Sequence, residues 1–287
     1  MRKTLLVRAM AGVAVFAGAW VAYTQNQPQA QPLKVNKIAN DLYELEGDGS
    51  GNVAVYLTDE GVIVVDDKFE RNYSDIMANI KKLTDKPVKY VLNTHQHGDH
   101  TGGNEKMKMG GVELIAHRNA RFNMANGKQP GLPQVTFADQ AQVFLGGKEV
   151  DAYYNGRGHT NGDVVIYFPA LKVLHTGDLF TTNGQGNVAP LVDYNGMGSA
   201  IEWTKTLDGV LKLDFDTVIP GHGPISKRAD LEKYRAGFER MQTSIRNLSR
   251  QGKNRDDVLK VLVSDFGWQQ TGLGTNQLDR VIAELKN

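Results

Sequence analysis

Residues 94–103 read T-H-Q-H-G-D-H-T-G-G and place three histidines and one aspartate within six consecutive positions. In near-extended backbone, His95 and His97 can turn their rings toward one metal ion, while Asp99 and His100 can reach a second. A solvated polar loop is the alternative interpretation. Imidazoles repel one another when protonated, however, and burying them unpaired is costly. The motif therefore predicts a metal site.

Three later residues supply the ligands that this cluster lacks. They are His159 in G-R-G-H-T-N-G-D, Asp178 in H-T-G-D-L-F and His222 in P-G-H-G. Each follows a predicted strand, and a sheet can aim side chains at its strand ends into one cleft. Five of the seven histidines are thereby used. For the other two we favour structural roles: His117 as a polar group at a helix start, and His175 as a strand residue or a support for the metal site.

Short apolar runs bounded by Gly and Pro predict the strands, and helical spacing predicts the helices. The predicted strands cover residues 42–45, 53–57, 62–66, 88–93, 113–116, 141–145, 149–154, 164–168, 173–176 and 217–219. The predicted helices cover residues 72–83, 117–126, 200–211, a long charged helix from a cap at Ser226 to about residue 250, and residues 255–264 and 275–286. This order describes two sheet-and-helix halves, with candidate site residues at strand ends in each.

Composition narrows the class of protein. The chain has 287 residues, of which 40% are hydrophobic and 23% charged, so it can bury a sizeable core. Its formal net charge is +1 and no basic stripe is visible, which argues against a nucleic-acid partner and favours a small-molecule substrate. Cysteine is absent, so disulfides, thiolate nucleophiles and cysteine ligands are excluded. Any metal must be held by nitrogen and oxygen.

The N-terminus has the order of an export signal. Arg2, Lys3 and Arg8 flank an apolar run at 9–23, and a Gln- and Pro-rich stretch follows at 25–32. The run is shorter than the ~20 residues of a membrane span. Good cleavage sites are lacking, so an uncleaved anchor and a buried N-terminal helix both stay as alternatives. We predict a signal peptide or N-terminal anchor at 1–24, a linker at 25–40, a catalytic domain at 41–225 and a C-terminal helical extension packed on that domain at 226–287. The expected location is periplasmic or secreted, with membrane contact only through an uncleaved N-terminal segment.

The set H-x-H-x-D-H, then His, then Asp, then His, resembles the metallo-β-lactamase superfamily, in order and spacing from about Tyr43 to His222. The resemblance implies an α+β fold, the four-layer αββα sandwich with two sheets face to face and helices outside. It implies two zinc ions per chain, the first bound by His95, His97 and His159, the second by Asp99, His100 and His222, with Asp178 bridging both. Asp66, which ends the run I-V-V-D, matches an early aspartate of the family that supports the metal loop. An ordinary turn residue at a strand end is the alternative for Asp66.

The expected function is that of a zinc-dependent hydrolase. Two zinc ions ~3.5–4 Å apart can lower the pKa of a shared water toward ~7, so that metal-bound hydroxide attacks a carbonyl carbon. Asp99 is the catalytic candidate, as proton acceptor or orienting group. The substrate is expected to be a carbonyl-containing ester, thioester, lactone or β-lactam, because fold and ligands do not settle specificity.

Two features bear on the substrate and point in opposite directions. Familiar zinc β-lactamases have cysteine or serine where this chain has Asp178, whereas hydroxyacylglutathione hydrolases and lactonases carry aspartate. Export instead favours class B-like β-lactamase activity, which stays as an alternative. Residues 182–199 and 127–134 are expected to form rims of the cleft, with a plain surface connection as the alternative for 182–199. The C-terminal helices can cover the cleft or extend the core; helical spacing of Leu231, Tyr234, Phe238 and Met241 favours packing.

Two alternatives belong to other classes. One is an iron-dependent oxidoreductase of sulfur compounds on the same fold, or a di-iron enzyme with a flavin partner. The other is a non-catalytic zinc-binding or scaffold protein. The full set of seven ligands and the lack of a flavin domain favour two hydrolytic zinc ions.

Overall fold

The computed structural model of this chain describes residues 31–184, 190–268 and 273–286. The chain divides into two units, Met1–Gln31 and Pro32–Asn287. The predicted signal peptide or anchor at 1–24 lies outside the described residues. Among the residues that are described, no helix is long and apolar enough to cross a membrane.

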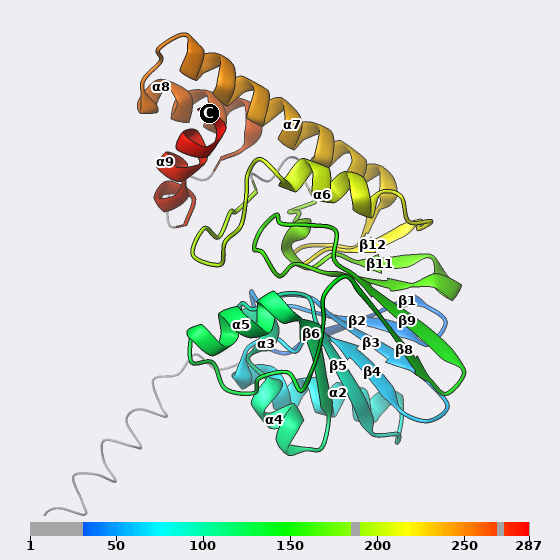
Figure 1. The fold of residues 1–287 in the computed structure, drawn as a ribbon. Coiled ribbons are helices and arrows are strands. Elements are labelled where there is room, and N and C mark those ends of the chain that lie inside the picture. Colours follow the sequence, from blue (N-terminus) through cyan, green and yellow to red (C-terminus); the bar gives the residue numbers. More distant parts are fainter. Residues whose placement is uncertain (1–30, 185–189, 269–272, 287) are drawn as a thin grey trace, which may run out of the picture. The chain divides into compact units, whose positions relative to one another are not determined.

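The first sheet, in the described part of the chain, has seven strands in sequence order (Figure 1). They are β1 (Lys34–Ala39), β2 (Leu42–Glu46), β3 (Val53–Leu57), β4 (Val62–Val65), β5 (Val88–Asn93), β6 (Glu113–His117) and β7 (Val135–Phe137). Neighbours from β1 to β4 are antiparallel, and those from β4 to β7 are parallel. The helical elements along this half are η1 (Glu70–Asn72), α2 (Tyr73–Leu83), α3 (Gly98–Thr101), α4 (Asn104–Met109) and α5 (Arg118–Asn126). Parallel pairs need crossover connections of this kind.

The second sheet has six strands among the described residues, in the order β13-β12-β11-β10-β9-β8. They are β8 (Gln140–Leu145), β9 (Lys148–Tyr153), β10 (Val165–Phe168), β11 (Val173–His175), β12 (Thr217–Ile219) and β13 (Ser226–Lys227). Because β9 and β11 are each antiparallel to β10, and β12 is parallel to β11, the strands β9, β11 and β12 run in one direction. The helical elements of this half are η2 (Pro169–Leu171), η3 (Gly177–Leu179), α6 (Trp203–Val210), α7 (Arg228–Arg250), α8 (Arg255–Phe266) and α9 (Leu273–Lys286).

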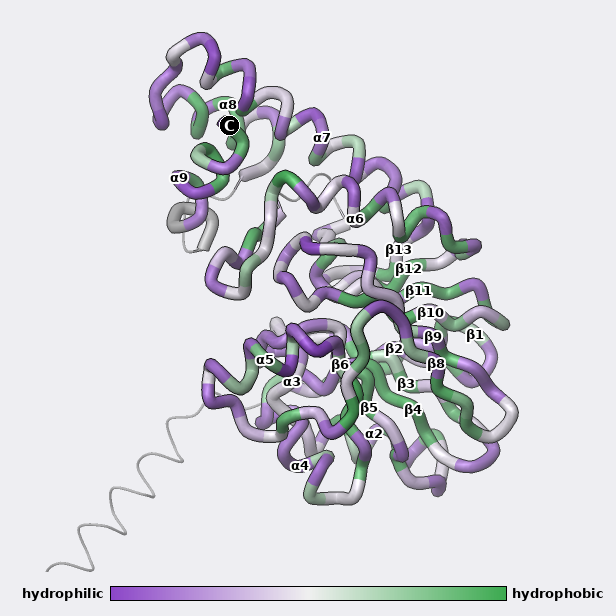
Figure 2. Tube along the Cα trace, viewed as in Figure 1, coloured by the Kyte–Doolittle hydropathy of each residue, from purple (hydrophilic) through white to green (hydrophobic). Residues whose placement is uncertain are grey.

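Three hydrophobic clusters fill the spaces between the layers of the fold. In β4, Val62 and Val64 pack toward Ile76 of α2, whereas Ile63 and Val65 pack between the two sheets. A strand buried on both faces reads as a continuous apolar run for this reason. The third cluster joins the second sheet to α6–α9. Figure 2 shows hydrophobic residues concentrated along β4 and β5 and alternating hydropathy along α7. The layers are helices, sheet, sheet and helices, which confirms the predicted αββα sandwich.

The long helix α7 packs on the second sheet. Leu231, Tyr234, Phe238 and Met241 are buried in the third cluster, as their helical spacing predicted. This burial accounts for the position of the C-terminal helices outside that sheet.

Two local predictions were wrong. Lys34–Ala39 is not linker but the edge strand β1, which pairs with β2 through its backbone and has exposed or half-buried side chains. Ser226 lies in β13, and α7 starts at Arg228, where the Lys227 amide donates to Asp230 Oδ2 at 2.8 Å.

Candidate metal centre

The seven predicted ligands lie in loops and short helical turns at one edge of the two sheets. They are His95 and His97 after β5, Asp99 and His100 in α3, His159 between β9 and β10, Asp178 in η3 after β11, and His222 after β12. The carboxyl ends of β9, β11 and β12 share an edge because these strands run in the same direction. The topology therefore gathers residues that are far apart in the sequence.

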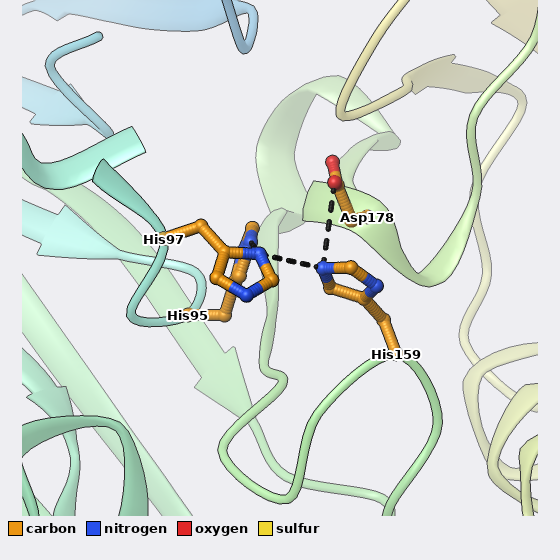
Figure 3. A group of neighbouring side chains, drawn as sticks. All are labelled: His95, His97, His159 and Asp178. Atoms are coloured by element: carbon orange, nitrogen blue, oxygen red, sulfur yellow. Dashed lines mark hydrogen bonds and ion pairs between the residues drawn. The ribbon is translucent and has the colours of Figure 1, made fainter. Parts of the chain in front are cut away.

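Four of these side chains form a first group (Figure 3). His97 Nδ1 lies 3.1 Å from His95 Nε2 and 2.8 Å from His159 Nε2. Asp178 Oδ2 lies 3.6 Å from His159 Nε2. One atom from each residue of this group lies within 4.8 Å of the others, which is close enough to hold one metal ion.

The other three side chains form a second group. His222 Nε2 lies 3.3 Å from His100 Nε2 and 3.1 Å from Asp99 Oδ2. Asp178 Oδ1 faces this group, at 3.3 Å from His100 Nε2 and 3.5 Å from His222 Nε2. Asp178 therefore lies between the two groups, with one carboxylate oxygen directed at each.

The polar atoms of this centre do not satisfy one another. His97 Nδ1 faces a ring nitrogen of His95 and another of His159, yet a ring nitrogen carries at most one hydrogen. Asp178 Oδ1 is buried and has no hydrogen-bond partner among the described residues. A buried polar atom left in this way costs about 1–3 kcal/mol. Cations between the nitrogens and carboxylates would remove the deficit, and zinc prefers this nitrogen and oxygen set. The residues fit metal ions.

Asp66 supports the centre through hydrogen bonds, as the resemblance to the family implied. Its carboxylate accepts hydrogen bonds from the Thr94 amide and hydroxyl, both at 2.8 Å, and lies 2.8 Å from His100 Nδ1. The residue is fully buried and has φ 59°, a strained conformation for a residue other than glycine. A partner on the far ring nitrogen sets the orientation of a ligand histidine.

Asp193 has the same role for another ligand, and sequence reasoning missed it. Its Oδ2 lies 2.8 Å from His97 Nε2. Burial lowers the pKa of His97, but the hydrogen bond to Asp193 and the negative charges of Asp178, Asp193 and Asp99 together outweigh burial and raise it. Burial raises the pKa of Asp193, but the bond to His97, the Gly196 amide and the charges of His97 and His159 together outweigh burial and lower it to about 2. Its position in the predicted rim loop was the only signal in the sequence. The Leu191 carbonyl lies 2.6 Å from His159 Nδ1 in the same way.

The pKa shifts of two candidate ligand histidines, His95 and His159, suit metal binding. Burial lowers the pKa of His95, and the charge of His100 lowers it further. Burial and the charge of His97 lower the pKa of His159 to about 4. Both rings are therefore neutral at neutral pH, which is the state that binds a metal. Burial raises the pKa of Asp178, but positive charge, foremost that of His100, outweighs burial and holds it well below its usual range.

The two remaining histidines lie outside both groups and have structural contacts. His117 precedes α5, where Nδ1 accepts from the Asn119 amide, and its ring stacks on Tyr154 at 4.0 Å. His175 is buried in β11, with Nε2 at 3.1 Å from the Asn52 carbonyl oxygen. The structural interpretation of both is confirmed.

A pocket of about 320 Å³ adjoins the first group. Its lining includes His97, the 191–195 loop, and Gln277 and Arg280 of α9. The predicted rim at 182–199 thus borders a pocket through its second half, while residues 185–189 lie outside the described residues. The other predicted rim, at 127–134, reaches α3 through Gln129, whose Oε1 accepts from the Thr101 hydroxyl at 3.4 Å. Its role stays a prediction.

Comparison with known proteins gives consistent matches. A family model described as the metallo-β-lactamase superfamily matches residues 47–222. Metallo-β-lactamase type 2 of Elizabethkingia meningoseptica is 28% identical over 211 residues, which cover 70% of this chain and 82% of that protein. Metallo-β-lactamase type 2 of Bacillus cereus is 26% identical over 183 residues, or 62% of this chain and 68% of that protein.

Solved structures agree with the fold. A metallo-β-lactamase from Pontibacter korlensis has a TM-score of 0.64 at 25% identity, and the match covers 72% of this chain and 99% of that one. The DIM-1 metallo-β-lactamase has a TM-score of 0.64 at 21% identity, with 74% and 99% covered. The second match bears on the fold alone.

Proposed function

This chain belongs to the metallo-β-lactamase superfamily and is a metallo-hydrolase, and from that premise we propose that it uses two zinc ions to cleave a carbonyl compound. His95, His97 and His159 would hold the first zinc, Asp99, His100 and His222 would hold the second, and Asp178 would contribute to both. The observation that carries the proposal is the position of Asp178, with one oxygen toward each group. A single-metal site would not require this arrangement.

Zinc ions bound at these residues supply Lewis acidity and bring the pKa of water toward ~7. The residues of the chain hold and tune them. Asp178 offsets part of the positive charge between the groups. Asp66, Asp193 and the Leu191 carbonyl orient the rings of His100, His97 and His159.

Asp99 is the proposed acid–base residue. Its side chain is 24% exposed, whereas that of Asp178 is 11% exposed and that of Asp66 is fully buried. A carboxylate that reaches the cleft while contacting His222 can accept a proton from a bound reactant and return it.

The proposed substrate is an ester, thioester, lactone or β-lactam. The names of the relatives favour a β-lactam as the second, narrower candidate, because those from Elizabethkingia meningoseptica and Bacillus cereus are metallo-β-lactamases. The aspartate at position 178 favours the broader class, since familiar zinc β-lactamases have cysteine or serine there. Nitrocefin, an acyl-homoserine lactone and an acyl thioester, each offered to the zinc-loaded protein, separate these substrates.

We also propose an exported location and the domain division predicted above, except that the catalytic domain begins with β1 at Lys34. The charge pattern of residues 1–24 supports export. Burial of Leu231, Phe238 and Met241 supports a C-terminal extension packed on the domain.

Metal content and turnover test the function together. We expect the protein to purify with about two zinc ions per chain, and His97→Ala or Asp178→Ala to lose bound zinc and nearly all hydrolysis. Asp214→Ala is the matched control, because the Asp214 side chain is exposed and pairs with the exposed Lys172, away from the candidate metal centre. Unchanged turnover in Asp178→Ala would reject the mechanism. Mostly iron, with oxygen consumption, would favour the sulfur-oxidising alternative.

A further inference from the structure

We propose that Arg280 binds a carboxylate group of the substrate in the pocket beside His97. The substrates would then be carbonyl compounds that also carry a monoanionic carboxylate. This inference rests on the proposed hydrolase function. Arg280 belongs to α9, which lies outside the residues 47–222 that match the family model. The C-terminal helices would thus contribute to specificity as well as to the core.

The guanidinium of Arg280 is held in place by neutral partners. Nη1 donates to Asn195 Oδ1 at 3.1 Å and Nη2 to the Tyr194 carbonyl at 3.4 Å. The group also lies over the Tyr194 ring, 4.6 Å from its centre. In the described part of the chain, no carboxylate forms an ion pair with Arg280. Its charge is therefore available to a ligand, and its position is already set.

The wall of the pocket is fastened to α9 at further points. Tyr194 Oη donates to Glu284 Oε2 at 2.6 Å, and Ser199 Oγ donates to Glu284 Oε1 at 2.6 Å. The Val192 amide donates to Gln277 Oε1. Because α9 orders this loop before any ligand arrives, binding requires little further ordering.

The lining selects the chemistry of the ligand. A volume of about 320 Å³ lies at the lower end of the range for small-molecule pockets. Leu191 and Val192 offer apolar contact, and the forked guanidinium matches a planar carboxylate. Asp193 lines the same pocket, and a carboxylate at this position opposes a dianion such as phosphate. His97 and Arg280 share the pocket, so one small molecule can reach both.

Matched substrate pairs test the inference on the zinc-loaded, full-length protein. Each pair is a carboxylate substrate and its methyl ester, for example nitrocefin and nitrocefin methyl ester, or a succinyl thioester and its methyl ester. For Arg280→Ala we expect KM for the acid to rise about 10- to 100-fold while kcat for the acid stays almost unchanged. Both KM and kcat for the ester should stay almost unchanged. Arg280→Lys should fall between, because it keeps the charge but loses the fork. The control Arg240→Ala removes an exposed arginine from α7 and should leave KM and kcat unchanged for both the acid and the ester.

A second variant separates charge from loop position. Tyr194→Phe removes the hydroxyl that contacts Glu284 and leaves the charge of Arg280 in place. Any change in KM or kcat should therefore be the same for the acid and for the ester. If Arg280→Ala also affects both alike, or affects neither, the inference is overturned. If the wild type cleaves nothing, the proposed function fails, and binding then tests the inference alone.

For that case, ligand-observed NMR compares 3-phenylpropanoate with 3-phenylpropanamide on the zinc-loaded protein. The expected result is carboxylate binding that weakens at least tenfold in Arg280→Ala, with the amide unaffected. Carboxylate binding unchanged in that variant would refute the role of Arg280. Inorganic phosphate displacing the carboxylate at equal concentration would refute the assignment of a monoanion.

Discussion

Replacing Asp193 by asparagine removes the negative charge behind His97 while keeping the size of the side chain. The carboxylate lies 2.8 Å from His97 Nε2, and no other partner of that nitrogen is present among the described residues. An asparagine side chain can present either its oxygen or its amide to the ring, so the His97 tautomer and orientation lose their anchor. The change should act on the first metal and leave the second, which Asp66 supports, in place.

The magnitude follows from the contacts. A shift of the Asp193 pKa from 3.8 to about 2 corresponds to about 2 kcal/mol in the metal-free protein, for a side chain that is 22% exposed. Because this pKa is lowered, that stability is present above pH 3.8 and is lost as the pH falls toward 2. The pKa of His97 is raised, so its contribution is lost as the pH rises through the raised value. In the metal-loaded protein, removal of such a partner typically weakens metal affinity about 10- to 100-fold.

Two assays follow. Competition with a chelator should show one zinc ion bound about 10- to 100-fold more weakly in Asp193→Asn and the other unchanged. Thermal unfolding of the metal-free variant at pH 5 should show a free energy of unfolding lower than that of the wild type by up to about 2 kcal/mol. This difference should be smaller at pH 2. Asp214→Asn, at an exposed ion pair, is the control. Equal weakening of both ions, or none, would refute the assignment of Asp193 to the first group.

Three further predictions concern stability. Removal of metal by EDTA should lower Tm, and zinc should restore it, because a ligand at 1,000 times its Kd stabilises by about 4 kcal/mol; an unchanged Tm would argue against bound metal. Gly51→Ala should cost about 1–3 kcal/mol and weaken the second zinc, because a Cβ there would lie 2.2 Å from His100 Cε1. Gly98→Ala, whose Cβ would meet nothing within 4 Å, is its control in the same zinc titration. Burial raises the pKa of Glu44 to about 7, so the stability it contributes is lost as the pH rises from 4.5 through 7. At pH 8, Glu44→Gln should therefore have a free energy of unfolding higher than that of the wild type by up to about 3 kcal/mol, and so a higher Tm, but not at pH 4.5. The same gain at both pH values would contradict this.

Strong periodic patterns predicted the helices and strands of the core well. The residues of β3, β4 and β5 are apolar runs bounded by turn residues, and the α7 stripe has helical spacing. Predictions failed where strand pairing, rather than a hydrophobic pattern in the sequence, determines the local structure. β1 has little apolar alternation and is held by backbone hydrogen bonds to β2.

The candidate ligands could be read from the sequence because their chemistry is local. Imidazoles and carboxylates packed into H-x-H-x-D-H have few uses other than binding metal, and His159, Asp178 and His222 each follow a strand signal. Asp193 and Arg280 carry no such signal. A lone aspartate in a loop and an exposed arginine on a terminal helix are common in any soluble protein.

The sequence by itself determined which side chains are able to bind metal, and that strands deliver them, because residue chemistry and hydrophobic periodicity are written along the chain. Only the tertiary structure decided that Asp178 faces both groups, that Asp193 anchors His97, and that Arg280 shares a pocket with the centre. These relations join residues between 19 and 183 positions apart in the sequence. Residues so far apart in the sequence are brought together only by the pairing of strands and the packing of α9, which no local sequence pattern predicts.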